Sequence, residues 1–277
     1  MNTKKHTLVL GGNGKTGSRI AQRLTQLGWP VRIGSRSGSP AFDWEDQRSW
    51  MPALEGMEAL YISFYPDLAM PGAVNDIRAL TDLAVQSGVQ HVVLLSGRGE
   101  KEAQDCEQIV MQCGIPWTVV RASWFSQNFS ESYLLDPVLA GHVALPAGNV
   151  GEPFIDTDDI ADVAVTALTQ PGHTNQLYEV TGPRLLTFAE AIAIIAKATG
   201  RPIQFEHIPI EAYTATLREY QLPEDLVSLI TYLFTEVLDG RNTYVTGDVE
   251  RVLGRPARDF ADYAQQTAAS GAWAVPA

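Results

Sequence analysis

The chain has 277 residues, of which 45% are hydrophobic and 19% are charged, as expected for a folded protein with a substantial apolar core. Its net charge of -12, with no basic run longer than Lys4-Lys5, argues against a nucleic acid as partner. No apolar run approaches the roughly 20 residues that cross a bilayer, and the polar start of the chain lacks a signal-peptide core. We therefore expect a cytoplasmic protein that does not bind membranes.

The cysteines and histidines show no metal-binding pattern. Cys106 and Cys113 stand seven positions apart in a helical pattern, which suits neither a disulfide framework nor a zinc site. The histidines are scattered along the chain, at His6, His91, His142, His173 and His207. We expect no bound metal.

Short apolar strands alternate with amphipathic helical patterns along the N-terminal two thirds of the chain. The predicted strands are 7–10, 31–33, 59–64, 91–95, 117–120 and 177–180. Helical patterns separate them, and glycines such as Gly28, Gly88 and Gly114 end several of these helices. This alternation predicts the α/β class, with a doubly wound and mostly parallel sheet.

Beyond Gly182-Pro183 the pattern becomes mainly helical. Thr187 and Glu190 form a capping box at the start of one helix, and further helices are expected at 223–238 and 257–270. We therefore divide the chain into a sheet domain, 1–183, and a smaller helical segment, 184–277. Part of 123–157 is expected to contribute to a cleft for the substrate.

A glycine-rich turn directly follows the first predicted strand and opens the first helix. Such a turn lets a diphosphate approach the backbone, and the helix N-terminus offers free N–H groups and a partial positive charge. Its position between a strand and a helix favours dinucleotide binding on a Rossmann fold over a purely structural glycine turn. The residues of this motif are Gly11, Gly12, Asn13, Gly14, Lys15, Thr16 and Gly17.

Gly14-Lys15-Thr16 also matches the end of the P-loop motif of nucleotide triphosphatases. That motif requires a glycine five positions before Gly14, where this chain has Val9 inside the predicted strand. The P-loop interpretation is therefore disfavoured.

The second predicted strand ends in a sequence that favours NADP(H) over NAD(H). An NAD site places a carboxylate here to bind the ribose 2′-hydroxyl, but the chain has Ser35, Arg36 and Ser37. A guanidinium and two hydroxyls suit a 2′-phosphate; the alternative is an exposed turn arginine. Asp43 either contacts the adenine edge or caps the next helix.

The ends of the later strands should face the same cofactor, because ligands of open α/β sheets lie beyond the carboxyl ends of the strands. The residues expected on the cofactor are Ser63, Phe64, Tyr65, Ser96 and Gly97. Ser96 is also the candidate polar group at the reacting centre, although a strand-terminal serine is often only a hydrogen-bonding turn residue.

The residues after the fifth predicted strand supply aromatic surface and one amide. We assign to the substrate Arg98, Ala122, Ser123, Trp124, Phe125 and Asn128. The alternative for Trp124 and Phe125 is packing at a domain interface. Asp156, Asp158 and Asp159 precede a predicted helix at 160–168, where capping is favoured over acid–base chemistry.

These motifs together resemble the NmrA-like family, an atypical branch of the short-chain dehydrogenase/reductases. The resemblance rests on segments 11–17, 34–37, 94–96, 117–121, 154–161 and 178–183. Within the family, the chain is similar to the branch of festuclavine and agroclavine dehydrogenases and their bacterial counterparts. The resemblance implies NADP(H) on the N-terminal domain and a small organic molecule between it and the C-terminal helices.

One departure from the wider superfamily concerns catalysis. Ordinary members carry Tyr-x-x-x-Lys on the helix after the serine-bearing strand, whereas residues 100–114 contain Lys101 and no tyrosine. We expect a reductase that passes hydride from NADPH to an already electrophilic acceptor, such as an iminium, a quinone or an activated double bond. The alternative is a redox sensor that binds the dinucleotide without turnover and acts through a protein partner.

Overall fold

The computed structural model describes residues 4–275, which form two compact units that interleave along the chain. The first unit comprises residues up to Ala122 together with Asp158–Glu179 and Arg251–Gly254, and the second comprises Ser123–Thr157, Val180–Glu250 and the segment from Arg255. The sequence-based division at residue 183 is continuous, whereas the chain crosses between these units five times, after residues 122, 157, 179, 250 and 254. Residues 123–157, expected near the substrate, belong to the second unit.

A six-stranded sheet forms the centre of the first unit. Its order is β2-β1-β3-β4-β5-β7, and the pairs from β2 through β5 are parallel. β1 and β3 are buried along their whole length, as expected for central strands of a sheet covered on both faces. The strands are β1 (Thr7–Leu10), β2 (Val31–Gly34), β3 (Ala59–Ile62), β4 (His91–Gly97), β5 (Trp117–Ala122) and β7 (Gln176–Val180).

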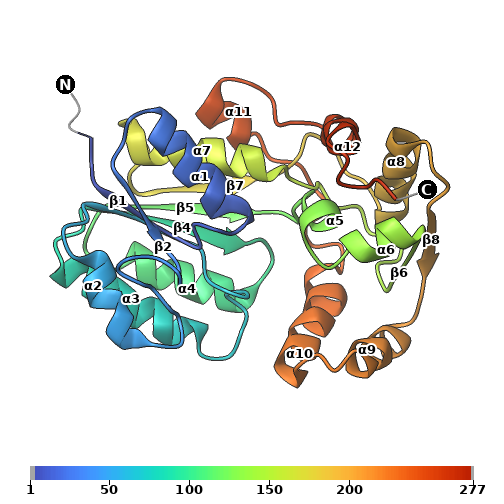
Figure 1. The fold of residues 1–277 in the computed structure, drawn as a ribbon, viewed down its shortest axis with the longest axis horizontal. Helices are drawn as coiled ribbons and strands as arrows, with labels where there is room; N and C mark the ends of the chain where they lie inside the picture. Colours follow the sequence, from blue (N-terminus) through green and yellow to red (C-terminus); the bar gives the residue numbers. More distant parts are fainter. Residues whose placement is uncertain (1–3, 276–277) are drawn as a thin grey trace. The chain divides into compact units, whose positions relative to one another are not determined.

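Helices cover both faces of this sheet (Figure 1). One face carries α1 (Lys15–Gln26) and α7 (Thr157–Thr169), joined by ion pairs from Arg23 to Asp158 and Asp162 at 2.5 and 2.7 Å. The other carries α2 (Trp50–Leu54), which follows the short helix η1 (Gln47–Ser49), then α3 (Ala73–Gln86) and α4 (Lys101–Met111). The predicted doubly wound α/β fold is confirmed.

The second unit is mainly helical, with a small parallel sheet that the sequence analysis did not expect. β6 (His142–Leu145) pairs with β8 (Gln204–His207). The helices are α5 (Asn128–Glu131), α6 (Leu135–Ala140), α8 (Phe188–Thr199), α9 (Ile210–Glu219), α10 (Glu224–Tyr232), η2 (Leu233–Val237) and α12 (Phe260–Ala269). The helix α11 (Asp248–Leu253) begins in the second unit and ends in the first. The predicted capping box is confirmed, because Thr187 Oγ1 accepts from the Glu190 amide and the Glu190 carboxylate accepts from the Thr187 amide.

Aromatic rings fill the core of the second unit. Phe188, 0% exposed, lies 5.3 Å from Trp124 and 5.0 Å from Phe154 between ring centroids, and it also contacts Phe129 and Phe234. Edge-to-face pairs of this kind add to the free energy of burial. Within residues 4–275, none of the helices has the length and apolar content to span a bilayer.

We predict that Phe188→Ala lowers the free energy of unfolding by about 3–5 kcal/mol, because it removes a buried ring from a packed aromatic cluster. Urea unfolding followed by tryptophan fluorescence measures the change. Leu185→Ala is the control, since Leu185 is 37% exposed and its loss should cost less than about 1 kcal/mol. Equal losses for the two variants would contradict the assigned core.

Candidate dinucleotide site

The glycine-rich turn joins β1 to α1 in the first unit, as the sequence predicts. The Gly14 amide donates to the Gly11 carbonyl at 2.8 Å, and α1 begins at Lys15. Among the described residues, no side chain caps the start of α1, and its first turn holds no acidic residue. Its first amides and the positive end of its dipole are therefore available to an anion.

The glycines of this turn are required by close backbone contacts. A Cβ atom added at Gly17 would overlap the carbonyl oxygen of Gly11, and one added at Gly12 would lie 2.6 Å from Cγ2 of Ile33. Gly11 itself has a φ of 65°, which disfavours any side chain. The turn therefore presents bare backbone on the side where a diphosphate fits.

Thr16 connects the glycine-rich turn to β3 by a hydrogen bond. Its side chain is buried, and Oγ1 accepts a hydrogen bond at 2.9 Å from the phenol of Tyr61 on β3. Burial raises the pKa of the Tyr61 phenol well above its usual range, so this donor stays protonated. Asn13 and Gly14, by contrast, are exposed.

The end of β2 presents the residues predicted to select NADP(H). The hydroxyls of Ser35 and Ser37 lie 3.3 Å apart. Arg36 between them is exposed, and no residue within 4–275 bonds to its guanidinium. The Ser35 carbonyl accepts from the amides of Gly38 and Phe42, so the loop is held while the guanidinium stays accessible to a phosphate.

Asp43 is part of the turn that follows. Its carboxylate accepts from the Glu45 amide at 3.1 Å, and its carbonyl accepts from the indole N–H of Trp50 at 2.6 Å. Asp46, not Asp43, caps the helix η1. The capping interpretation of Asp43 is therefore wrong, and its contact with adenine stays a prediction.

The loop after β3 lies beside the glycine turn. The Ser63 side chain is the nearest group to Gly11, where a Cβ atom would lie 3.2 Å from that of Ser63. Phe64 packs on Trp44 with 4.6 Å between ring centroids, and Tyr65 is 78% exposed. Ser63 and Gly11 are thus brought together, as predicted for residues that share one ligand.

Ser96 and Arg98, at the end of β4, belong to a buried chain of charged groups. The Ser96 hydroxyl donates to Glu107 on α4 at 2.6 Å, and Arg121 on β5 forms two hydrogen bonds with the same carboxylate. Arg121 lies 3.5 Å from Glu179 on β7, which in turn accepts from Arg98 at 2.7 Å. Two arginines and two glutamates therefore alternate beneath the edge of β4, β5 and β7.

This network gives Ser96 and Arg98 partners within the protein. Ser96 and Arg98 are only 3% and 4% exposed, and their polar groups are bonded to protein. Removing one partner of such a buried network is strongly destabilising, so both residues have a structural role. The catalytic role of Ser96 and the substrate contact of Arg98 stay predictions.

The remaining predicted substrate residues follow β5. Ala122 ends β5, and Ser123 is buried with its hydroxyl donating to the Pro153 carbonyl at 2.6 Å. Trp124 packs against Phe188 and Phe234 in the aromatic core of the second unit, and its contact with a substrate stays a prediction. Phe125 forms a bridge with Ile155, and Asn128 begins α5.

A pair of carboxyls near the end of β4 was not expected from the sequence. Glu100, directly before α4, is 7% exposed and has the Asp67 carboxyl of the loop after β3 as a neighbour. Burial and the nearby carboxylates raise the pKa of Glu100 well above its usual range. Only burial could have indicated this residue, and a glutamate before a helix gives no sign of burial in the sequence.

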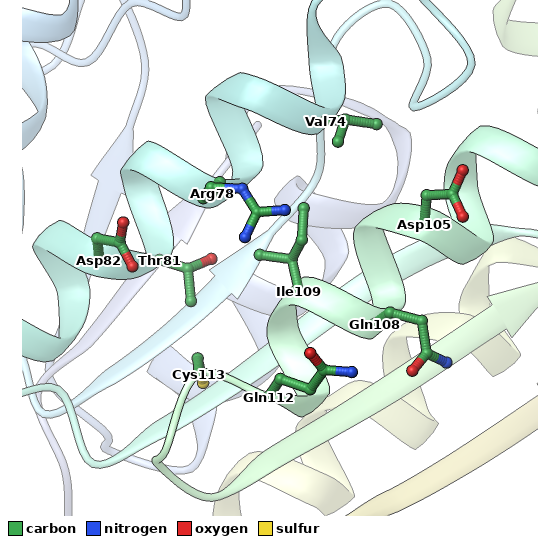
Figure 2. A pocket seen from close by; sticks show the side chains of 9 residues that line it. All are labelled: Val74, Arg78, Thr81, Asp82, Asp105, Gln108, Ile109, Gln112 and Cys113. Carbon is green, nitrogen blue, oxygen red and sulfur yellow. The ribbon is translucent and has the colours of Figure 1, made fainter.

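Other features of the described chain do not coincide with the predicted site. Residues 4–275 contain no group of three or more His, Cys, Asp or Glu side chains suited to a metal ion. A groove of about 470 Å³ lies between α3 and α4, with Arg78, Asp82 and Asp105 on its rim (Figure 2). It contains none of the residues predicted to bind cofactor or substrate.

We predict that Gly17→Ala weakens NADPH binding by at least about 10-fold, because the added methyl group forces the diphosphate turn to move. Isothermal titration calorimetry on the folded variant measures the affinity, and circular dichroism checks the fold. Ser18→Ala, at an exposed position of the same helix, should bind as the wild type does. Unchanged affinity in a folded Gly17→Ala variant would contradict the assigned turn.

Comparison with known proteins identifies the family of this chain. The model of the NmrA-like family matches residues 3–265. The NAD(P)H azoreductase of Xenophilus azovorans is 31% identical over 95% of this chain and 98% of its own length, and the agroclavine dehydrogenase of Claviceps fusiformis is 30% identical over 92% and 95%. Both relatives are therefore similar to this chain from end to end.

Solved structures show the same fold. The NADPH-dependent quinone oxidoreductase QOR2 of Escherichia coli, solved with NADPH, has a TM-score of 0.78 at 19% identity and covers 94% of this chain and 99% of its own. Because the family model spans nearly all of the sequence, this chain belongs to the NmrA-like family, as its motifs predict.

Proposed function

We propose that this protein is an NADPH-dependent reductase that transfers hydride to a small electrophilic organic molecule. The observation that carries the proposal is the bare glycine turn at the uncapped start of α1, with an accessible Arg36 at the end of β2. The names of the two relatives, an NAD(P)H azoreductase and a dehydrogenase, agree with this chemistry.

Different residues of the first unit bind different parts of the cofactor. The amides of the glycine turn and of the first turn of α1 bind the diphosphate. Arg36, Ser35 and Ser37 bind the 2′-phosphate through charge-assisted hydrogen bonds. Ser63, beside Gly11 in the loop after β3, contacts the same ligand in this proposal. When bound, the dinucleotide supplies the hydride, and the protein supplies orientation and exclusion of water.

The proposal extends to the rest of the chain. Residues 1–183 carry the dinucleotide, 184–277 and part of 123–157 shape the substrate site, and the protein works in the cytoplasm. The substrate is a small molecule with a polarised double bond, as an azo compound, a quinone or an iminium has. The α4 helix lacks the tyrosine of ordinary dehydrogenases, so a redox sensor that acts through a protein partner is the competing function.

The test of the reductase function is NADPH oxidation with a panel of acceptors. The panel holds a quinone, an azo dye, an iminium and an activated double bond, and the loss of NADPH absorbance gives the rate. We expect turnover of at least one acceptor that is absent without protein. Tight NADPH binding with no turnover across the panel would instead favour the sensor.

We predict that Arg36→Ala weakens NADPH binding by about 10- to 100-fold while NADH changes less than about 2-fold, because the 2′-phosphate loses a charge-assisted partner. Calorimetric titration with each dinucleotide measures both affinities. Arg48→Ala is the matched control, an exposed arginine paired with Asp46 that should leave both unchanged. Equal losses for NADPH and NADH would refute the phosphate contact.

A further inference from the structure

The Glu100 carboxyl lies at the edge of the sheet where ligands of open α/β folds bind. Glu100 directly precedes α4, and only 7% of its surface is exposed. Its side chain folds back over the end of β4, because a Cβ atom added at Gly97 would overlap both carboxyl oxygens of Glu100. The carboxyl ends of parallel strands face the ligand, so this carboxyl is placed beside the predicted cofactor residues Ser96 and Gly97.

The Glu100 carboxyl has a second carboxyl as its neighbour. This neighbour is Asp67, in the loop that follows β3. An ionised carboxylate only accepts hydrogen bonds, so two carboxyls bond only when one of them is protonated. Within residues 4–275, Oε2 of Glu100 is buried and receives no hydrogen bond from any N–H or O–H group. A proton on one of the two carboxyls removes the repulsion between them and supplies the missing hydrogen-bond donor.

The surroundings assign that proton to Glu100. The carboxylates that face it are Asp67, together with Glu102 and Glu107 from α4. Burial in the first place, and then these negative charges, raise the pKa of Glu100 well above its usual range. Both effects favour the protonated, neutral form of Glu100, and burial also raises the pKa of Asp67.

Within the described residues 4–275, the basic groups near Glu100 form their ion pairs with other carboxylates. Lys101 bonds to Asp105 at 2.6 Å, and Arg121 bonds to Glu107 and lies near Glu179. With these cations committed to other carboxylates, a proton is the charge that neutralises Glu100. A buried acid that is kept protonated at neutral pH is a suitable general acid.

We propose that Glu100 is the proton source of the reduction, with Asp67 as the carboxylate that holds it in place. This inference rests on the proposed reductase function and deepens it. As the acceptor receives hydride on one atom of its polarised double bond, the O–H bond of Glu100 breaks and its proton passes to a heteroatom of that acceptor. The product has gained two hydrogens, and Glu100 is left as a carboxylate that recovers a proton from water.

The substrate class follows from this step. An iminium needs no proton when it accepts hydride, because its cationic charge is neutralised by the hydride itself. A quinone or an azo group gains negative charge on a heteroatom and does need a proton. The structure therefore favours a neutral acceptor whose oxygen or nitrogen is protonated during reduction.

The protonated state of Glu100 is tested without cofactor or turnover. In full-length protein with ¹³C-labelled glutamate carboxyls, NMR should show one glutamate that remains protonated at neutral pH, and Glu100→Gln should remove that signal. In Asp67→Asn the same signal should titrate at lower pH, because the neighbouring negative charge is lost. If every glutamate titrates in the usual range, the proposal is overturned.

The role in reduction is tested by kinetics with menadione and with the azo dye methyl red. We predict that Glu100→Gln lowers kcat by about 100-fold or more and leaves the calorimetric affinity for NADPH within about 2-fold, because the amide keeps the shape but cannot release a proton. In the wild type, kcat should fall as pH rises through the pKa of Glu100, and this decline should be absent in Glu100→Gln. Glu100→Asp should restore part of the rate.

The control variant is Glu55→Gln, an exposed glutamate of the same unit, which should behave as the wild type. If the wild type reduces either acceptor and Glu100→Gln does so equally fast, the role of Glu100 is refuted while the reductase function stands. If the wild type binds NADPH and reduces no acceptor, the reductase function fails, and the role of Glu100 fails with it.

Discussion

The contact between Gly17 and the carbonyl of Gly11 is the constraint on which the candidate site depends. Because no Cβ fits between them, the chain turns within a few residues from β1 into α1, and the helix starts with its amides uncapped. A side chain at Gly17 would overlap the Gly11 carbonyl and force the turn to move. The proposed anion site is therefore a property of backbone geometry, and in the proposal the side chains around it select the dinucleotide.

A second constraint acts below the carboxyl edge of the sheet. The alternating charges of Arg98, Glu179, Arg121 and Glu107 connect β4, β7, β5 and α4 within one unit. Each charge has a partner of opposite sign, which is the condition under which buried ions are tolerated. Such pairs add little net stability, but they hold the strand ends in one arrangement. The loops that follow β4 and β5 thus start from fixed points.

Much of the first unit was predictable because its strands are buried on both faces and its helices are amphipathic. Thr7–Leu10 was predicted to the residue, and the turn after it was recognised from glycine spacing. The sheet of β6 and β8 was missed because each strand has four residues, most of them partly exposed, and its pairing partner is distant in sequence. Short exposed strands carry no clear alternation of apolar and polar residues.

The site was predictable only where it is made of backbone. Glycine spacing indicated the turn, and Arg36 stood where a selecting residue belongs. The partners of Ser96 and Arg98 were not accessible to such reasoning, because Glu179 lies 81 positions from Arg98 and only the fold brings them together. The sequence correctly predicted that Ser96 lies at the carboxyl edge of the sheet. It did not predict that the Ser96 hydroxyl donates a hydrogen bond to Glu107.

Two glutamates near the start of α4 show how environment separates roles. Glu107 is fully buried and forms two hydrogen bonds with Arg121, so its charge is balanced by a fixed cation. Glu100 is almost as buried, yet its partner is another carboxyl, Asp67. The first glutamate therefore contributes to holding the strands, whereas the second keeps a proton that it can release. The helix α4 lacks the usual tyrosine, yet an acid precedes it at the edge of the sheet. Burial beside a carboxylate favours the protonated form of Glu100, whereas a tyrosine phenol is protonated at neutral pH because of its ordinary pKa.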